Sequence, residues 1–142
     1  MIYIACDHQG YQTKLKVLKF LTKNGVEFED LGTNSTDSVD YPDFAKKVGT
    51  NVLEHKDTMG ILICMTGIGM SMAVNRFKGI RGALCHTVKD AYCARFHNDA
   101  NVLVLSARDC GSKHKKIINT FLNTQFEGGR HIRRIEKMDK LG

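Results

Sequence analysis

Residues 64–71, CMTGIGMS, are the segment of the chain best suited to chemistry. They follow an apolar run and place the Cys64 thiol directly before a glycine-rich turn that opens a predicted helix. Backbone N–H groups are unpaired at a helix N-terminus, and together with the helix dipole they favour negative charge. A thiol at such a place can act as a base or a nucleophile. A buried structural cysteine beside an ordinary strand-to-helix turn is the alternative, and this segment alone leaves both open.

Two short clusters join a histidine to a second polar side chain. Asp7-His8 follows the first apolar run, and side chains at the end of a parallel strand face the ligand crevice of such sheets. The alternative is that Asp7 caps the next helix while His8 is merely exposed. His97-Asn98 follows a helical stretch, and a histidine there can pass protons near neutral pH. In that case the alternative is a charge at the helix C-terminus, with Asn98 as the cap.

Two arginines near the end of the chain are candidates for an anion site. Arg130 and Arg134 lie four residues apart, so they share one face of a predicted helix, and paired guanidinium groups suit phosphate. The chain carries 21 Lys and Arg against 15 Asp and Glu, a net charge of +6, and a solvated basic stripe is the alternative. Positive charge would also fit a nucleic acid, but no aromatic interleaving or recognised nucleic-acid motif accompanies it.

The remaining cysteines, histidines and methionines give no indication of a metal site or of another functional role. The five cysteines are odd in number and form no CxxC pair, which argues against a disulfide framework and a structural zinc site. No compact cluster of His, Asp and Glu is visible, so no metal is expected. Three histidines without ligand spacing are expected at the surface, namely His55, His86 and His114. Three methionines are expected to fill the core, namely Met59, Met70 and Met72.

The elements that must position these side chains alternate along the chain. Short apolar runs predict five strands, at residues 2–6, 26–31, 60–64, 80–85 and 101–106. Helical spacing and turn residues predict helices at residues 10–24 (with Leu15, Leu18 and Leu21 on the apolar face), 42–54, 67–76, 88–96 and 112–122. Five such alternations indicate an α/β fold, a doubly wound five-stranded parallel sheet with helices on both faces. Ligands of such sheets bind beyond the carboxyl ends of the strands.

An extra C-terminal helix is predicted from residue 129, after a Gly-Gly break. Ile132, Ile135 and Met138 are expected to face inward from it, and the break would allow the helix to pack on a neighbouring subunit. The length fits a single domain, residues 1–142. Neither a signal peptide nor an apolar run of about 18 residues is found, so no membrane partner is expected. Unpaired thiols favour the cytoplasm.

Eight stretches match a known family in order and spacing. They are ACDH (5–8), DLGT (30–33), DYP (40–42), GILIC (60–64), TGIG (66–69), NRFKGIR (75–81), HNDANVL (97–103) and EGGRH (127–131). With them the chain resembles the ribose-5-phosphate isomerase type B family, which also includes allose-6-phosphate and galactose-6-phosphate isomerases. The stretches run from end to end, so the resemblance covers nearly the whole chain.

The resemblance implies a flavodoxin-like three-layer sandwich and a homodimer or tetramer whose sites are shared between subunits, with no metal and no cofactor. It implies that Cys64 moves a proton between C1 and C2 of a sugar phosphate through an enediolate, while Thr66 and His97 assist opening of the furanose ring. The residues implied to face the enediolate oxygen are Met65, Gly67, Ile68, Gly69 and Ser71. Those implied to hold sugar hydroxyls are Asp7, His8 and Asn98. Those implied to hold the phosphate are Arg130 and Arg134, with help from Arg108.

The implied activity is the interconversion of D-ribose 5-phosphate and D-ribulose 5-phosphate, in the non-oxidative branch of the pentose phosphate pathway. One residue departs from the family pattern, because Met65 stands where glycine is usual. A positive φ at that position would strain a methionine, and the side chain could also narrow the pocket. Allose 6-phosphate is therefore an alternative substrate. A non-catalytic sugar-phosphate-binding module is an alternative of another class, because a fold alone does not fix a function.

Overall fold

The computed structural model describes residues 1–142 as five strands and six helices in alternation. The strands are β1 (Ile2–Cys6), β2 (Phe28–Asp30), β3 (Met59–Cys64), β4 (Gly82–Leu84) and β5 (Val102–Ser106). The helices are α1 (Tyr11–Lys23), α2 (Tyr41–Glu54), α3 (Ile68–Val74), α4 (Val88–Phe96), α5 (Gly111–Asn123) and α6 (Arg130–Asp139). Every predicted element is present, and α4 has the predicted bounds.

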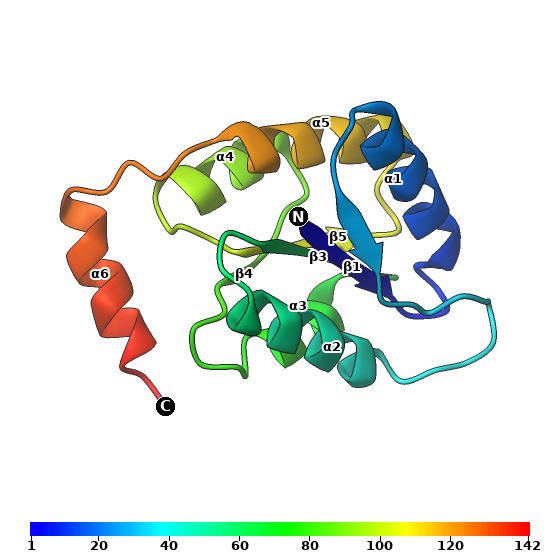
Figure 1. The fold of residues 1–142 in the computed structure, drawn as a ribbon, viewed down its shortest axis with the longest axis horizontal. Coiled ribbons are helices and arrows are strands. Elements are labelled where there is room, and N and C mark those ends of the chain that lie inside the picture. The colour runs from blue at the N-terminus through cyan, green and yellow to red at the C-terminus, as the bar shows by residue number, and fades with distance from the viewer.

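The strands form one all-parallel sheet in the order β2-β1-β3-β5-β4. Figure 1 shows α1, α4 and α5 on one face of the sheet and α2 and α3 on the other. Each face has its own apolar core, and β1 and β5 are buried along their whole length. Strands covered on both faces read as continuous apolar runs, which is why the sequence marks them so clearly. The predicted doubly wound three-layer sandwich is confirmed.

The two edge strands are shorter than predicted. Strand β2 covers three of the predicted residues 26–31, and β4 covers three of 80–85. An edge strand pairs with a neighbour on one side only. Residues at its ends can therefore stop pairing at the cost of hydrogen bonds to one strand rather than two. Helix α3 is also shorter than the predicted 67–76, because the Asn75 side chain turns back to bond the backbone of Gly82.

The buried face of α1 differs from the predicted one. Lys14, Val17 and Leu21 are buried, whereas Leu15 is 37% exposed. Lys14 is fully buried because its ammonium group reaches through the helix–sheet layer to Asp30, where it finds an ion-pair partner. Leu21 is buried as predicted and Leu18 is half-buried, so the prediction is wrong mainly at Leu15.

Two further burial predictions are partly wrong. Met70 is fully buried as predicted, but Met59 is only half-buried and Met72 is 69% exposed. His55 and His86 are exposed as predicted, whereas His114 is buried because its Nε2 lies 2.8 Å from the carbonyl oxygen of Ser106. Residues on a helix flank can turn to either side, so their burial depends on the neighbouring element.

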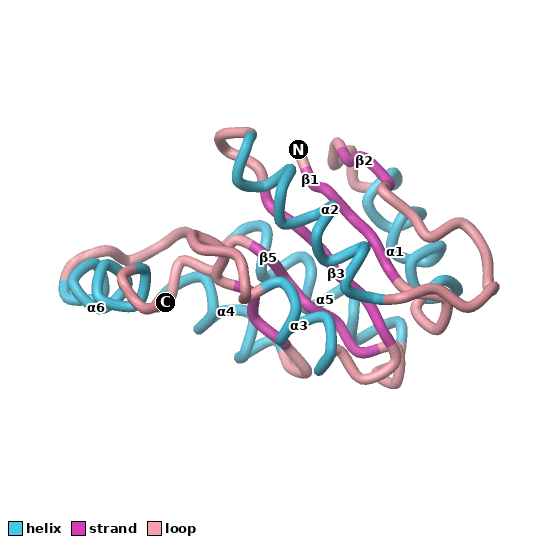
Figure 2. Tube along the Cα trace, turned by 90° about the horizontal axis from the view of Figure 1, so that it is seen from below, coloured by secondary structure: helices cyan, strands magenta, loops and turns pink.

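Helix α6 stands apart from the sandwich, as Figures 1 and 2 both show. The prediction that its apolar residues face inward is wrong within this chain, because Ile132 is 46% and Met138 40% exposed and Ile135 is half-buried. The helix is attached at its start, where His131 is buried, and near its end, where Asp139 pairs with Arg81 at 3.4 Å. No helix combines the length and hydropathy that a bilayer crossing requires.

Candidate functional site

The Cys64 thiol lies at the carboxyl end of β3, the most central strand of the sheet. It is 5% exposed, and its Sγ accepts a hydrogen bond of 3.2 Å from the backbone N–H of Gly67. The next amide, of Ile68, donates to the Thr66 hydroxyl oxygen at 3.2 Å. Reactive thiols are found at helix N-termini, and α3 begins at Ile68, directly after this turn. The turn therefore holds Cys64 and Thr66 side by side in a setting that suits a base.

The turn owes its shape to Gly67, which has a φ of 77°. A Cβ on Gly67 would lie 2.4 Å from Leu84 Cδ1, so Leu84 would have to shift, and the positive φ would strain any other residue. Met65 is not among the residues with positive φ, and its carbonyl oxygen accepts a bond of 2.9 Å from the Ser106 hydroxyl. The methionine is therefore accommodated without the backbone strain that a positive φ would impose. Its side chain is 37% exposed.

The first turn of α3 offers unpaired amides beside the thiol. The amides of Gly69 and Met70 have no acceptor within the chain, as the first N–H groups of a helix generally do not. Ser71 differs, because its amide donates to the carbonyl of Gly67 at 3.0 Å. The amides of this turn that are free to meet a ligand oxygen are thus those of Gly69 and Met70.

Asp7 and His8 lie at the end of β1, next to β3 in the sheet. One carboxylate oxygen of Asp7 accepts from the amides of Gln9 and Gly10 at 3.0 and 2.9 Å, so Asp7 shapes the turn before α1. It does not cap the helix, because the N-cap residue is Gly10 and the helix start has no side-chain capping bond. The other oxygen remains available for a ligand. His8 is half-buried, and its Nδ1 accepts from the Val39 amide at 3.2 Å, which leaves Nε2 as the donor of a neutral ring.

A second group of predicted site residues lies at the other end of the sheet. His97 caps the C-terminus of α4, and Asn98 follows it as an exposed residue. The His97 ring lies 5.0 Å from that of His131 in the first turn of α6, the helix that carries Arg130 and Arg134. These four predicted residues belong to one region, which we call the α6 region and define as residues 97–98 and 127–139.

The chain topology separates the α6 region from Cys64. Helix α4 starts beyond the carboxyl end of β4 and runs back to the amino end of β5. A five-residue strand is about 16 Å long, and roughly this length separates the two groups along β5. Arg108 lies on the Cys64 side, where its amide contacts the Ser106 hydroxyl and the Met65 carbonyl. One chain therefore brings together the thiol, Thr66, Asp7 and His8, but not His97 or the paired arginines.

Two buried polar residues near the site were missed by the sequence analysis. His114 supports the end of β5 through Ser106, whose hydroxyl in turn holds the loop at Met65. Lys14 donates to Asp30 and to the Thr33 carbonyl, both at 2.6 Å. The signal for Lys14 was its place at i, i+3 and i+7 with Val17 and Leu21. No comparable pattern marks His114.

The remaining thiols differ in their readiness to ionise. Burial raises the pKa of Cys6 to about 11 and that of Cys85 to about 12, so both stay protonated near neutral pH. Cys110 is exposed, and its pKa is lowered mainly by a hydrogen bond with Ser112 at 3.5 Å. It lies in the loop after β5, ahead of α5. Chemical reactivity at Cys110 is therefore separate from that of Cys64.

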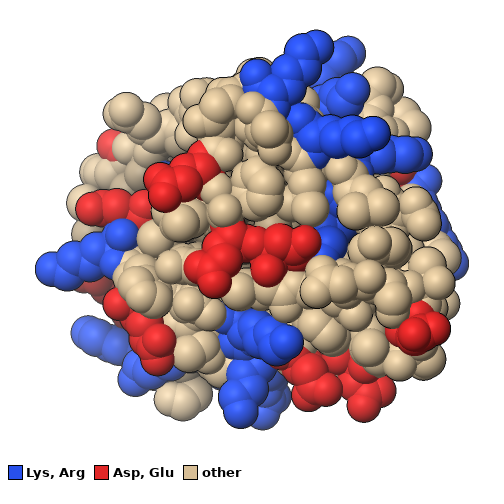
Figure 3. Space-filling model, turned by 45° about the vertical axis from the view of Figure 1, so that its right-hand side comes forward, with Lys and Arg blue, Asp and Glu red and all other residues tan.

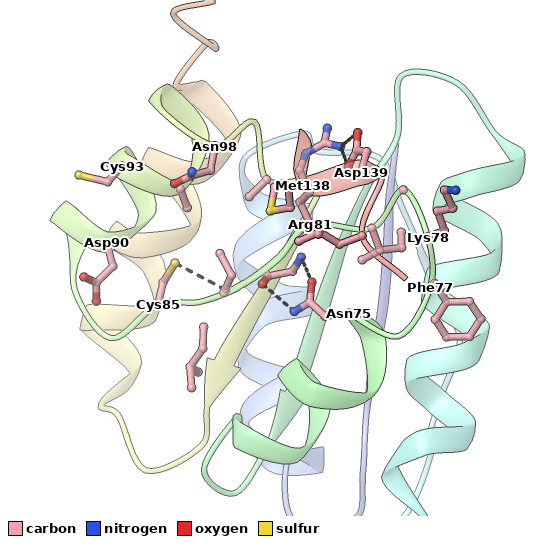
Figure 4. A pocket seen from close by; sticks show the side chains of 18 residues that line it. Asn75, Phe77, Lys78, Arg81, Cys85, Asp90, Cys93, Asn98, Met138 and Asp139 are labelled. Carbon is pink, nitrogen blue, oxygen red and sulfur yellow. Dashed lines mark hydrogen bonds and ion pairs between the residues drawn. The ribbon is translucent and has the colours of Figure 1, made fainter. Parts of the chain in front are cut away.

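Two hollows lie away from the thiol. One, about 620 Å³, opens between α6 and the β4 edge; Figure 4 shows Asn98 lining it and Arg81 reaching Asp139. The other, about 520 Å³, lies between α1 and α5 and is lined by lysines of both helices. Figure 3 shows basic side chains gathered along the upper right of one face, with acidic ones across its middle. Neither hollow includes Cys64 or Thr66.

The expectation that no His, Asp and Glu residues cluster is wrong. Potential ligand atoms of His97, Glu127 and His131 all lie within 4.8 Å of one another. Glu127 and His131 are one helical turn apart in number, but His97 comes from a different element. Only the fold brings it to them, so the sequence spacing gave no sign of the cluster.

The fold and the thiol turn together define a class, a doubly wound α/β protein with an amide-lined thiol at the end of its central strand. The sequence matches the Ribose/Galactose Isomerase family over residues 2–138, and the chain belongs to that family. It is 42% identical over 141 residues to Ribose-5-phosphate isomerase B of Escherichia coli, covering 99% of this chain and 95% of that one.

Solved structures agree with this assignment. A ribose 5-phosphate isomerase from Thermotoga maritima superposes with a TM-score of 0.96 at 50% identity, covering 99% of this chain and 97% of that one. Ribose-5-phosphate isomerase B from Mycoplasma genitalium, solved with bound ribulose-5-phosphate, gives a TM-score of 0.94 at 45% identity and covers 98% and 93%. The resemblance that the sequence motifs carry is thereby confirmed.

Proposed function

We propose that this protein is an aldose–ketose isomerase that interconverts D-ribose 5-phosphate and D-ribulose 5-phosphate. The observation that carries the proposal is the Cys64 thiol, 3.2 Å from the Gly67 amide and beside the unpaired amides of Gly69 and Met70. A base next to oxyanion donors is what proton abstraction beside a carbonyl requires. Family membership and the relatives named above support the substrate.

In the proposed reaction the Cys64 thiolate removes the proton from C2 of the open-chain aldose. The electron pair passes to the carbonyl oxygen at C1, giving an enediolate. The hydroxyl proton at C2 moves to the C1 oxygen, and the thiol returns its proton to C1 as the C2 oxygen becomes the carbonyl. Amides of the loop stabilise the developing oxyanion, and each good donor of this kind contributes about 3–4 kcal/mol. The positioned base adds roughly 10²–10⁴-fold in rate.

Ring opening and phosphate binding need the residues of the α6 region. We assign Thr66 and His97 to ring opening, Arg130 and Arg134 to the phosphate, and Asp7, His8 and Asn98 to sugar hydroxyls. Arg108 remains a candidate helper at the phosphate. With these roles, the energy of phosphate binding is used to orient the reacting carbons. We assign the basic residues near the end of the chain to the phosphate of this substrate rather than to a nucleic acid.

Because His97 and the arginines lie at the far end of the sheet from Cys64, we propose that each site combines the thiol side of one chain with the α6 region of another. Exposed apolar residues on both sides support a homodimer or a tetramer of such dimers. On the thiol side they are Met65, Ile68 and Met72, and on α6 they are Ile132 and Met138. Burial of such side chains drives association.

We further propose that the reaction needs no metal, since base, oxyanion donors and phosphate ligands are all side chains or amides of the protein. The expected result is full activity in the presence of a strong chelator. Activity that vanished with the chelator and returned with a divalent ion would contradict this. The five free thiols support a reducing compartment, and hence the cytoplasm.

A coupled assay on ribose 5-phosphate and allose 6-phosphate tests the substrate assignment. We expect kcat/KM to be higher for the pentose phosphate, and a preference for the six-carbon sugar would overturn the assignment. A non-catalytic sugar-phosphate binder is the alternative of another class. It would bind ribose 5-phosphate without turning it over, whereas an isomerase consumes it.

A further inference from the structure

We propose that His97, Glu127 and His131 form a binding site for a divalent transition-metal ion of the zinc class, and that an ion bound there inhibits the isomerase. The three residues offer two imidazole nitrogens and one carboxylate oxygen within 4.8 Å of one another. His131 Nε2 lies 3.0 Å from Glu127 Oε2, and the His97 ring centroid lies 5.0 Å from that of His131. A metal can replace the proton that His131 and Glu127 share.

The backbone holds the three side chains together before any ion binds. The Glu127 amide donates to the carbonyl oxygen of Phe96 at 3.0 Å. Because Phe96 directly precedes His97, this bond holds Glu127 close to His97 although the two belong to different segments. Gly128 and Gly129 follow with φ of 76° and 57°, and this turn starts α6 so that His131 returns over Glu127. Residues other than glycine adopt such φ values at a cost. The cluster is therefore built by the fold rather than by flexible surface side chains.

The donor set selects the class of ion. Two histidines and one carboxylate leave a fourth position for water or another ligand, as in zinc sites that bind exchangeable groups. Imidazole suits zinc, copper, nickel and cobalt, whereas calcium and magnesium prefer oxygen ligands. His131 is 7% exposed and His97 is half-buried, while Glu127 is exposed and leaves an entry path.

Inhibition follows from the position of His97. A nitrogen bound to a metal cannot accept or donate the proton needed for ring opening. An ion at the cluster also places positive charge beside the start of α6, which carries Arg130. This inhibitory part depends on the proposed function, because it needs His97 to act in ring opening. The binding part does not depend on it.

Binding is tested with Zn²⁺ alone, by competition with a chromophoric chelator on the metal-stripped protein. A Cys110→Ser background removes the exposed thiol that would compete for the ion. We expect one ion per chain, with affinity reduced by roughly 100-fold or more in Glu127→Gln, since even indirect ligand partners contribute 10–100-fold. His55→Gln, an exposed histidine outside the cluster, is the control and should bind as the parent does. Equal affinity in Glu127→Gln and the parent would overturn the site.

Cobalt reports the ligand type directly. Co²⁺ at this cluster should give d–d bands without thiolate-to-metal charge transfer, and the bands should be lost in His131→Gln. A charge-transfer band that disappears in Cys64→Ala would place the ion on the catalytic thiol instead and overturn the proposal. Unchanged bands in His131→Gln would do the same.

Inhibition is tested by Zn²⁺ titration of turnover. We expect loss of activity over the binding range, reversal by chelator, and a midpoint shifted upward by at least roughly 100-fold in Glu127→Gln. Glu127→Gln keeps an amide oxygen for His131, so its activity without metal should match the parent. Binding without inhibition would overturn the inhibitory role and leave the isomerase assignment intact. If no turnover of ribose 5-phosphate is found, the proposed function fails while the binding test still stands.

Discussion

The two ends of the sheet carry different parts of the proposed site and are built in different ways. At the carboxyl end, Cys64 and its loop are fixed by backbone hydrogen bonds and by a buried central strand. At the other end, the α6 region lies outside the sandwich and is joined to it by a glycine turn and a few polar contacts. The first region has the geometry of a reaction centre in a single chain. The second has the charge and the exposed apolar surface on which the proposed shared site depends.

This difference implies different consequences of mutation. Changes at the carboxyl end should alter the chemical step, because they act on the groups that face the reacting carbons. Changes at His97, Asn98, Arg130 and Arg134 should alter substrate binding or ring opening, and changes at the exposed apolar residues of α6 should alter assembly.

Cys64→Ala should lower kcat by roughly 10²–10⁴-fold, because the positioned base is lost. Binding of ribose 5-phosphate, measured by calorimetry, should change little. Cys64 is buried and its side chain is small, so the alanine variant should fold, and thermal unfolding is the control for this. Retained turnover in a folded variant would contradict the assigned base.

Arg134→Ala should lower kcat/KM by roughly 10–100-fold, the value of one or two lost charge-assisted hydrogen bonds to phosphate. The effect should fall mainly on KM. Arg133→Ala is the matched control, since Arg133 is an exposed neighbour on a different face of the same helix. Equal losses in the two variants would indicate a general charge effect in place of a phosphate contact.

Lys14→Met should lower the free energy of unfolding by roughly 3 kcal/mol, because it leaves the Asp30 carboxylate without its buried partner. Urea denaturation measures the change. Lys16→Met, on the exposed face of the same helix, should stay within about 0.5 kcal/mol of the parent. A small effect at Lys14 would mean that water reaches Asp30 well enough to replace the ammonium group.

Cys110 should be the first thiol to react with iodoacetamide as the pH is raised toward neutrality, since its pKa is lowered. Cys6 and Cys85 should stay unmodified in the folded protein, because burial raises their pKa values to about 11 and about 12. Ser112→Ala should shift the alkylation profile of Cys110 to higher pH by removing the hydrogen bond to sulfur. Mass spectrometry of digests measures each site. Faster reaction at Cys85 than at Cys110 would contradict the assignment, and activity should change little on Cys110 modification.

The sequence predicted the elements well because their signals are local. Fully buried strands such as β3 and β5 are continuous apolar runs, and the glycine turn before α3 is visible as a motif. The site was predicted as a set of residues, but not as two separated groups. That separation depends on the direction in which α4 runs, a property of topology that no single motif encodes.

The errors have a common cause. His114 was expected at the surface, yet it found a buried polar partner in another element, and Lys14, for which nothing was predicted, did the same. The apolar residues of α6 were expected to face inward, or to pack on a neighbouring subunit after the glycine break, and within this chain Ile132 and Met138 are exposed. Contacts between distant segments decide these cases, and residue type alone does not report them.

Mixing two variants with different defects shows whether each active site joins two chains. Cys64→Ala and the double variant Arg130→Ala/Arg134→Ala are unfolded and refolded together at equal amounts. If sites are shared, half of the dimers are mixed and each has one intact site, so about a quarter of the parent activity should return. No recovery above the sum of the two variants, in a sample shown to contain mixed dimers, would contradict the account.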